Sequence, residues 1–394
     1  MSVSTPTSEP TNTRWRSHVA LLTAGAFAVG TDGFVIAGIL PSIAADLHVD
    51  IAAAGQLVTV FAIAYAVTTP LLATLTASWP MHRVLLVALA LFGVGNAMTA
   101  LAPDYTLVLV SRVIAAAGAG AYTANASATA TMLAGEKHRG RALSLVVLGS
   151  TTALAIGAPL GTAIGTAMGW RAAIWGVTGL ALLVAPLITL RLPRLASQPG
   201  TGLRERLRPL TDRRILRVLV VTLVVFTGIY IPYTYISAIY APAVGGDGNL
   251  VAVLLLVFGI GGTVGNLVVG RLSDRYGPRP VILAVTCLLT VGFVALPLFR
   301  GSLSGALAAV AVSSVLSFGV VTPQQHLIMS YAPGMQSVVA SWFQSALYVA
   351  ISLSGAVGAV GLSLWGAVWL PVVAAAATLG GAVIHVSGHD RASR

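Results

Sequence analysis

Residues 19–40 have the sequence VALLTAGAFAVGTDGFVIAGIL, an apolar run with one acidic side chain, Asp32, near its middle. An apolar run of about 20 residues is long enough, as a helix, to cross a hydrocarbon core about 30 Å thick. A carboxylate near the centre of such a helix costs at least about 2.5 to 3.5 kcal/mol, so it is usually retained for a function. The stretch therefore predicts a membrane helix that carries a proton, ion or substrate site.

Similar apolar runs recur from one end of the chain to the other. The composition is 57% hydrophobic and only 8% charged, which leaves too few charged side chains to cover a soluble protein of 394 residues. We therefore predict an all-α integral membrane protein without a soluble domain. Its twelve predicted transmembrane helices lie at residues 18–40, 53–77, 83–102, 105–133, 141–165, 171–192, 215–238, 249–270, 280–299, 303–331, 337–362 and 365–386.

The charged residues sort by membrane side. If the N-terminus lies inside, most basic residues fall in cytoplasmic loops, and only Arg171 and Arg300 fall outside. Lysine and arginine mark cytoplasmic loops in this way. The net charge of +11 therefore reflects topology rather than nucleic-acid binding, and both termini are predicted to be cytoplasmic. The outer loops carry instead the acidic residues Asp46, Asp50, Asp104 and Asp247.

The longest polar stretch runs from Leu192 to Ile215 and holds six arginines and three prolines. Six predicted spans lie on each side of it, which fits two helical bundles with a transport path between them. An alternative for the stretch itself is a surface helix lying on anionic lipid headgroups. The predicted parts are a disordered cytoplasmic tail at 1–17, a six-helix bundle at 18–192, a cytoplasmic linker at 193–214, a second six-helix bundle at 215–386 and a cytoplasmic tail at 387–394.

A weak internal repeat supports this division. The loop after the eighth span has the sequence GRLSDRYGPR at 270–279, and the corresponding loop after the second span is a less complete copy. In the better copy, Gly270 is expected to permit close helix contact. Asp274 is expected to pair with Arg275, Arg279 or a helix end, and such a cluster would latch one conformation.

Glycines and a proline follow one another at short intervals in the fifth span, at Gly149, Gly157, Pro159, Gly161 and Gly165. These residues remove side chains from one helix face, let another helix approach closely and supply a bend. We interpret the segment as a packing hinge for a conformational change. The alternative is ordinary packing between membrane helices, in which glycine and proline are common.

Three signatures make the chain similar to the major facilitator superfamily, and within it to the twelve-span drug/proton antiporter family. The loop motif usually written G-x-L-x-D-R-x-G-R is matched at 270–279, with the last arginine shifted by one residue. The fourth-span motif is matched by Arg112, Gly118 and Gly120, and the fifth-span antiporter motif is matched at 149–165. The resemblance covers almost the whole chain and implies a major facilitator fold of two six-helix bundles.

The first-half copy of the loop motif departs from the family pattern, because Ala77 and Ser78 replace its aspartate and first arginine. A loop degraded in this way resembles the branch that holds sugar-efflux and chloramphenicol-efflux exporters. The resemblance implies a monomeric, proton-coupled exporter of small amphipathic compounds in a bacterial inner membrane, with protons, the substrate and lipids as its partners. An exporter of a sugar or nucleoside-like metabolite is the alternative, and a membrane receptor or enzyme is a third hypothesis.

Arg112 is the only basic residue as deep in an apolar run as Asp32, and each lies about nine residues from a proline, Pro103 or Pro41, that marks one membrane face. Equal depth makes a contact possible. Burial favours the neutral form of a carboxylic acid and a nearby guanidinium favours the ionised form, so such a pair can bind and release a proton. Protonation would free Arg112 to bind a substrate oxygen or to change partners. The alternative is a permanent salt bridge that only joins two spans.

The wall of the substrate cavity is expected to come from polar and aromatic residues at mid-depth. The seventh span is the richest in them, since it reads YIPYTY from residue 230. The alternatives are an interfacial aromatic belt for the tyrosines and helix packing for the amides. The predicted substrate-binding residues are Tyr122, Asn125, Tyr230, Tyr233, Asn266, Gln324, Trp342, Gln344 and Tyr348.

The sequence predicts neither an enzyme nor a cofactor site. It contains no group of His, Cys and Glu with metal-ligand spacing, no catalytic Ser, His and Asp set that position supports, and no Walker loop for ATP. His326, near the cytoplasmic end of the tenth span, can titrate near neutral pH. A packing role is the alternative for this histidine.

Overall fold

The computed structural model describes residues 14–76, 78–193 and 207–387. The first thirteen residues of the predicted tail, Ala77 of the degraded loop, most of the predicted linker and the last seven residues lie outside these ranges. Within them, all regular secondary structure is helical.

The first half of the chain forms a short π-helix, Ala153–Gly157, and six α-helices. These are α1 (Arg14–Asp46), α2 (Ile51–Leu75), α3 (Met81–Leu101), α4 (Tyr105–Thr152), α5 (Ala158–Met168) and α6 (Trp170–Arg191). The second half contains short 3₁₀ turns at Arg208–Thr211 and Ala367–Trp369. Its α-helices are α8 (Arg213–Thr234), α9 (Ile236–Ile239), α10 (Ala241–Val244), α11 (Gly248–Tyr276), α12 (Pro278–Phe299), α13 (Leu303–Gly319), α14 (Val321–Ser330), α15 (Gln336–Trp365) and α16 (Leu370–Val386).

Eleven helical stretches of the described chain are long and apolar enough to cross a membrane, where the sequence predicts twelve spans. The difference lies in the stretch Tyr105–Met168, which is 64 residues long. As one straight helix it would extend roughly 96 Å, about three times the thickness of the hydrocarbon core. The chain turns at Gly135, whose φ of 65° is a conformation that suits glycine. The predicted spans 105–133 and 141–165 lie on either side of this turn, so the two counts describe the same path.

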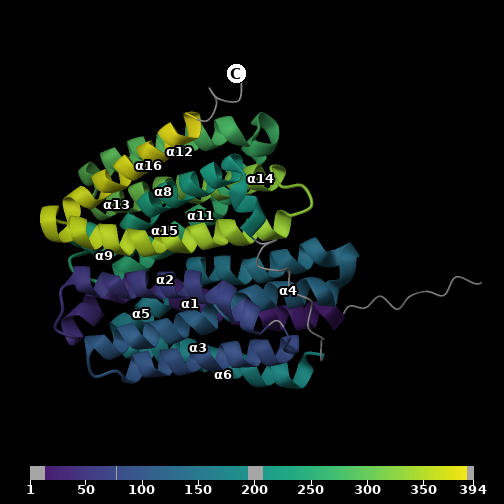
Figure 1. Ribbon diagram of the computed structural model, residues 1–394. Helices are drawn as coiled ribbons and strands as arrows, with labels where there is room; N and C mark the ends of the chain where they lie inside the picture. Colours follow the sequence, from purple (N-terminus) through teal and green to yellow (C-terminus); the bar gives the residue numbers. More distant parts are fainter. Residues whose placement is uncertain (1–13, 77, 194–206, 388–394) are drawn as a thin grey trace, which may run out of the picture.

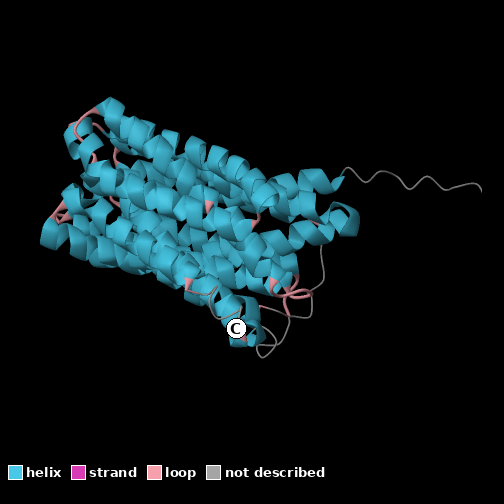
Figure 2. Ribbon diagram, turned by 90° about the horizontal axis from the view of Figure 1, so that it is seen from above, coloured by secondary structure: helices cyan, strands magenta, loops and turns pink. Residues whose placement is uncertain are grey.

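The two halves of the chain lie side by side (Figure 1). The helices of the first half, purple to teal, form one layer, and those of the second half, green to yellow, form the other. Seen from above, the helices run roughly along one common direction (Figure 2). This arrangement confirms the predicted fold class.

We name the two ends of the bundle by their charges. The acidic face is the end where α1 finishes at Asp46 and where α2, α4 and α11 begin behind Asp50, Asp104 and Asp247. Each of these last three carboxylates accepts a hydrogen bond from a backbone N–H of the first helical turn. Such caps satisfy N–H groups that have no partner inside the helix. The basic face is the opposite end, where α6 finishes at Arg191 and α8 begins.

The hydrophobic core is shared at one face and divided at the other. One cluster joins both halves, and its first-half members come from helix ends near the acidic face, such as Ile39 and Trp170. Toward the basic face, a second cluster consists of first-half residues, with Tyr348 as the one second-half side chain packed against it. A third cluster there contains only second-half residues, from Leu210 to Leu347. The halves are therefore joined at the acidic face and separate at the basic face.

Candidate functional site

Asp32 and Arg112 form an ion pair at the centre of the first half. Nη1 of Arg112 donates to both carboxylate oxygens of Asp32, at 2.8 and 3.0 Å. The two side chains are 0% and 1% exposed. The contact that equal depth predicts is thus confirmed. The role of the pair in proton coupling stays a prediction.

The surroundings of Arg112 leave part of its guanidinium unused. The guanidinium carbon lies 4.2 Å from the ring centroid of Phe61 on α2, a favourable cation–π distance. Its Nε is buried and has no hydrogen-bond partner. A buried donor without a partner is costly, so Arg112 retains a capacity to bind a further acceptor.

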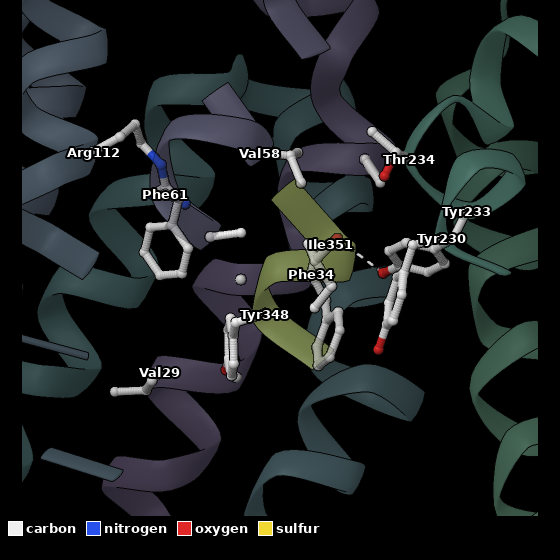
Figure 3. A pocket seen from close by; sticks show the side chains of 14 residues that line it. Val29, Phe34, Val58, Phe61, Arg112, Tyr230, Tyr233, Thr234, Tyr348 and Ile351 are labelled. Atoms are coloured by element: carbon white, nitrogen blue, oxygen red, sulfur yellow. Dashed lines mark hydrogen bonds between the residues drawn. The ribbon is translucent and has the colours of Figure 1, made fainter. Parts of the chain in front are cut away.

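A cavity lies between the two halves and Arg112 forms part of its wall. It encloses about 550 Å³ of empty space, including its open part. Figure 3 shows Phe61, Arg112 and Tyr348 on one side of this space, and Phe34, Tyr230, Tyr233 and Thr234 on the other. The remaining wall is apolar and comes from Val29, Gly30, Gly33, Ala37, Val58, Ala62 and Ile351. The wall thus offers aromatic and apolar surface with a few polar atoms, the composition of a site for a small organic compound.

Four residues singled out from the sequence meet at this wall: Arg112, Tyr230, Tyr233 and Tyr348. Tyr233 also joins the halves, because its hydroxyl donates to the backbone oxygen of Phe34 at 3.0 Å. Its ring meets the ring of Phe34 edge-on, with centroids 5.9 Å apart. The seventh span, which contains Pro232, therefore contributes to the cavity wall and also to the contact that joins the two halves.

Tyr122, Asn125 and Asn266 lie elsewhere. Tyr122 is fully buried, and its hydroxyl donates to the backbone oxygen of Leu22, so it packs α4 against α1. Asn125 donates to the backbone of its own helix, at Ala121. Asn266 accepts from Thr322 and thereby joins α11 to α14.

The three remaining residues predicted for the pocket lie near the basic face. Gln324 is buried and accepts a hydrogen bond from Thr222 of α8. Trp342 packs against the second-half core at that face, and Gln344 is exposed. In this conformation the polarity of these six side chains serves helix contacts or the surface rather than the cavity.

The fifth-span glycines bring α1 close to the segment that contains them. Side chains added at Gly149, Gly157, Gly161 and Gly165 would meet α1 at Thr23, Thr31, Val35 and Ile39 in turn. The contacts are spaced by eight and then by four residues on both sides, and they follow α1, which carries Asp32, from Thr23 to Ile39. Pro159 stands in the first turn of α5, directly after the π-helix Ala153–Gly157. A π-helix is a local widening that is frequent at functional sites, and no sequence signal announced it.

The loop motif at the basic face differs in detail from its prediction. The nearest atom to a side chain added at Gly270 would be 3.7 Å away, an ordinary contact, so this glycine is not required for packing here. The close contacts between α11 and α13 come instead from Gly261 and Gly265. Asp274 has Nδ1 of His326 as its neighbour, at 3.9 Å, in place of the expected arginines.

Those two arginines have other neighbours. Arg279 donates to the hydroxyl of Tyr331 at 2.7 Å. Arg275 lies over the ring of Tyr276, at 5.3 Å from its centroid. All these contacts stay within the second half, and among the described residues they do not join the motif to the first half.

Sequence reasoning missed the apolar part of the wall, above all Phe34 and Phe61. Neither residue is polar, and both lie in ordinary apolar runs, so the search for polar groups at mid-depth passed over them. An apolar side chain on a membrane helix can face lipid, protein or a cavity, so the sequence held no signal for either residue. In the described part of the chain, no group of His, Cys, Asp and Glu is placed to hold a metal ion.

Two helical bundles with a cavity between them form the architecture expected of a secondary transporter. The family model described as Major Facilitator Superfamily matches residues 22–355. The chain is 32% identical to an uncharacterized MFS-type transporter of Bacillus subtilis over 346 residues, which cover 88% of each chain. The chain belongs to the major facilitator superfamily.

The relatives include proteins named for an activity. The chain is 31% identical to a chloramphenicol resistance protein of Streptomyces lividans, over 87% of this chain and 88% of that protein. It is 32% identical to a chloramphenicol efflux pump of Mycobacterium tuberculosis, over 86% of this chain and 82% of that one.

Solved structures share the fold at low sequence identity. A bacterial homolog of the human lysosomal transporter Spinster, in an inward-facing and unoccupied conformation, matches with a TM-score of 0.72 at 16% identity, over 96% of this chain and 94% of that one. The nucleoside transporter NupG matches with a TM-score of 0.74 at 12% identity, over 95% and 99%.

Proposed function

We propose that this transporter exports small amphipathic compounds of the drug or antibiotic kind in exchange for protons. The observation that carries the proposal is the buried Asp32–Arg112 ion pair, whose arginine faces an aromatic cavity. The similarity to two proteins named for chloramphenicol resistance or efflux supports the same class of cargo.

Proton coupling follows from the electrostatics of the pair. While Asp32 is ionised, it holds the guanidinium of Arg112 against α1. Protonation of Asp32 removes this attraction, whereas Arg112 stays charged at any physiological pH. The freed guanidinium then changes partners and enters the cavity, where its unused donors seek an acceptor. A compound that fills the cavity takes the space of this second position and returns the guanidinium to Asp32, which then releases its proton. Proton and substrate therefore exclude each other, as exchange requires.

The cavity wall favours an amphipathic cargo over a sugar. Five aromatic rings, Phe34, Phe61, Tyr230, Tyr233 and Tyr348, offer apolar surface, while Arg112, Thr234 and tyrosine hydroxyls offer few polar groups. A sugar leaves many hydroxyls to be paired when it enters an apolar site, and each unpaired group costs roughly 1 to 3 kcal/mol. A sugar or nucleoside-like cargo remains the alternative that transport assays must separate.

Alternating access would use the two halves as moving units. We propose that residues 18–192 and 215–386 form these units, joined by the linker 193–214, within one monomer. We also propose that the basic face is cytoplasmic, which follows the positive-inside asymmetry and places both termini inside. The conformation with separate cores at the basic face would then be the one that receives cargo from the cytoplasm.

Liposomes test the proposal. Purified protein is reconstituted in liposomes with an acidic lumen, and the uptake of labelled chloramphenicol is followed. We expect accumulation that a protonophore abolishes and that Asp32→Asn lacks. Asp104→Asn is the matched control, because asparagine caps a helix about as well as aspartate does.

Three results would change the proposal. Uptake that ignores the pH gradient would contradict proton exchange. Equal uptake by the Asp32→Asn variant would contradict the role of the pair. Accumulation of labelled glucose or uridine, without that of chloramphenicol, would replace the proposed cargo by the alternative.

A further inference from the structure

Tyr65 of α2 and Tyr348 of α15 form a face-to-face stack between the two halves. Their ring centroids are 3.6 Å apart and their planes differ by 14°. Among the ring contacts found in the described part of the chain, this is the one parallel stack that crosses the boundary between the halves. Aromatic pairs usually prefer offset or edge-on contacts at 4.5 to 7 Å, so this close stack is a specific feature of the molecule.

The stack lies where the shared core divides. Tyr65 belongs to the first-half cluster near the basic face, and Tyr348 is the second-half side chain that packs into that cluster. Tyr348 is also a wall residue of the cavity. It is the α15 residue of the wall nearest the basic face, and Tyr65 lies one turn beyond Phe61 in the same direction. The stack therefore lies on the basic side of the cavity.

The other rings of the wall are placed to receive a flat group. One face of Phe61 is covered by the guanidinium of Arg112. Phe34 and Tyr230 stand across the open space from Tyr348 (Figure 3). When the tyrosine stack separates, its two ring faces lose their partners, and a planar ring of similar size can restore the contact.

We propose that Tyr65 and Tyr348 form an aromatic gate and that the substrate's own aromatic ring replaces one tyrosine in the stack as the gate opens. The gate would thus select compounds that carry a flat aromatic ring. This inference rests on the proposed export function and adds to it the chemical group by which the cargo is recognised.

Two ligands that differ only in the ring test the inference. Binding of chloramphenicol, which contains a 4-nitrophenyl ring, is compared with that of an analogue in which 4-nitrocyclohexyl replaces this ring. The measurement is equilibrium dialysis with the purified full chain in nanodiscs at one pH, so it requires no proton gradient. We expect the wild type to bind the aromatic compound roughly five- to tenfold more tightly, as ring stacking provides.

Variants of the two tyrosines then test whether the preference for the aromatic ligand depends on their rings. Tyr348→Leu and Tyr65→Leu should each abolish it, whereas Tyr348→Phe, which retains the ring, should keep it. Tyr276→Leu, which removes an exposed tyrosine at the basic face, is the control and should bind both compounds as the wild type does. Thermal unfolding checks that every variant is folded, and a purely structural role would weaken both ligands equally.

The possible results are distinct. Equal affinity of the wild type for the two compounds, or a preference that survives in both leucine variants, would overturn the inference and leave proton-driven export intact. No binding of either compound would overturn the inference together with the proposed cargo. A ring preference without uptake driven by a pH gradient would support the gate and contradict proton exchange.

Discussion

The two faces of this bundle hold the halves together in different ways. Near the acidic face, side chains of one half donate to backbone oxygens of the other: Tyr233 to Phe34, Gln56 to Gly355 and Ser352 to Thr59. Near the basic face, the contact of Asp274 with His326 and the hydrogen bond of Arg279 stay within the second half. The halves are thus closed at one end by several modest bonds, each worth about 0.5 to 1.5 kcal/mol.

This difference suggests how two rigid bundles can alternate between conformations that are closed at opposite faces. A closure built from neutral hydrogen bonds is strong enough to define a state and weak enough to be opposed by ligand binding or protonation. Contacts inside a half are of another kind, since the glycines of the segment 149–165 meet α1 closely from Thr23 to Ile39. We infer that contacts within a half persist while contacts between halves are exchanged.

The largest expected effect lies inside the first half. Arg112→Ala leaves Asp32 buried without its partner, and breaking such a pair costs about 3 to 5 kcal/mol. We expect a strongly lowered thermal unfolding temperature in detergent, and partial recovery in the double variant with Asp32→Asn, which removes the buried charge. An unchanged unfolding temperature for Arg112→Ala would show that the pair does not hold the half together.

A glycine between the halves should act on conformation instead. A side chain at Gly259 of α11 would collide with the backbone of Ala155 in the π-helix. Overpacking of this kind costs about 1 to 3 kcal/mol, and here only in the state closed at the acidic face. We expect Gly259→Ala to shift the protein toward the opposite state, measured as faster labelling of a reporter cysteine placed at the acidic face.

Gly270→Ala is the matched control, because the nearest atom would be 3.7 Å away. It should label at the rate of the parent protein. Equal labelling of the Gly259 and Gly270 variants would contradict the distinction between exchanged and persistent contacts.

A smaller shift is expected from Tyr233→Phe. The substitution keeps the ring in the cavity wall and removes only the hydroxyl that donates to Phe34. A lost hydrogen bond of about 1 kcal/mol corresponds to a roughly fivefold change in the balance of states. The same labelling assay should therefore report a modest increase, and a decrease would mean that this bond does not favour closure.

The smallest effect is expected at Asp274→Asn. Its partner His326 is 3.9 Å away, and the two side chains are 70% and 54% exposed. Exposed pairs contribute between nothing and about 1 kcal/mol. We expect an unfolding temperature close to that of the wild type; a large loss would show that the loop motif is already engaged in this conformation.

The sequence was most informative at charged residues within apolar runs, where burial of the charge costs free energy. Asp32 and Arg112 could be paired from depth alone, because charges within apolar runs are rare and rarely stand unpaired. The twelve crossings followed from hydrophobic length, and the turn at Gly135 separates two of them in one long helical stretch.

The sequence was least informative about the direction in which each side chain points. Polarity identified Tyr122 and Gln324 but not which way their side chains point, and both serve contacts between helices. Phe61 carries no signal at all, since an apolar residue on a membrane helix faces lipid, protein or cavity with equal ease. Gly270 fits the family motif, yet the close helix contact lies at Gly265, because contact depends on where two helix surfaces cross.

The exchange of substrate for a proton at Asp32 is tested most directly by proton release. Chloramphenicol is added to the purified protein in weakly buffered detergent solution, at a pH low enough for Asp32 to be protonated, and the pH change is recorded. The account predicts that the wild type and Asp104→Asn release protons on binding and that Asp32→Asn binds without release. Equal release by Asp32→Asn, or binding to the wild type without any release, would contradict it.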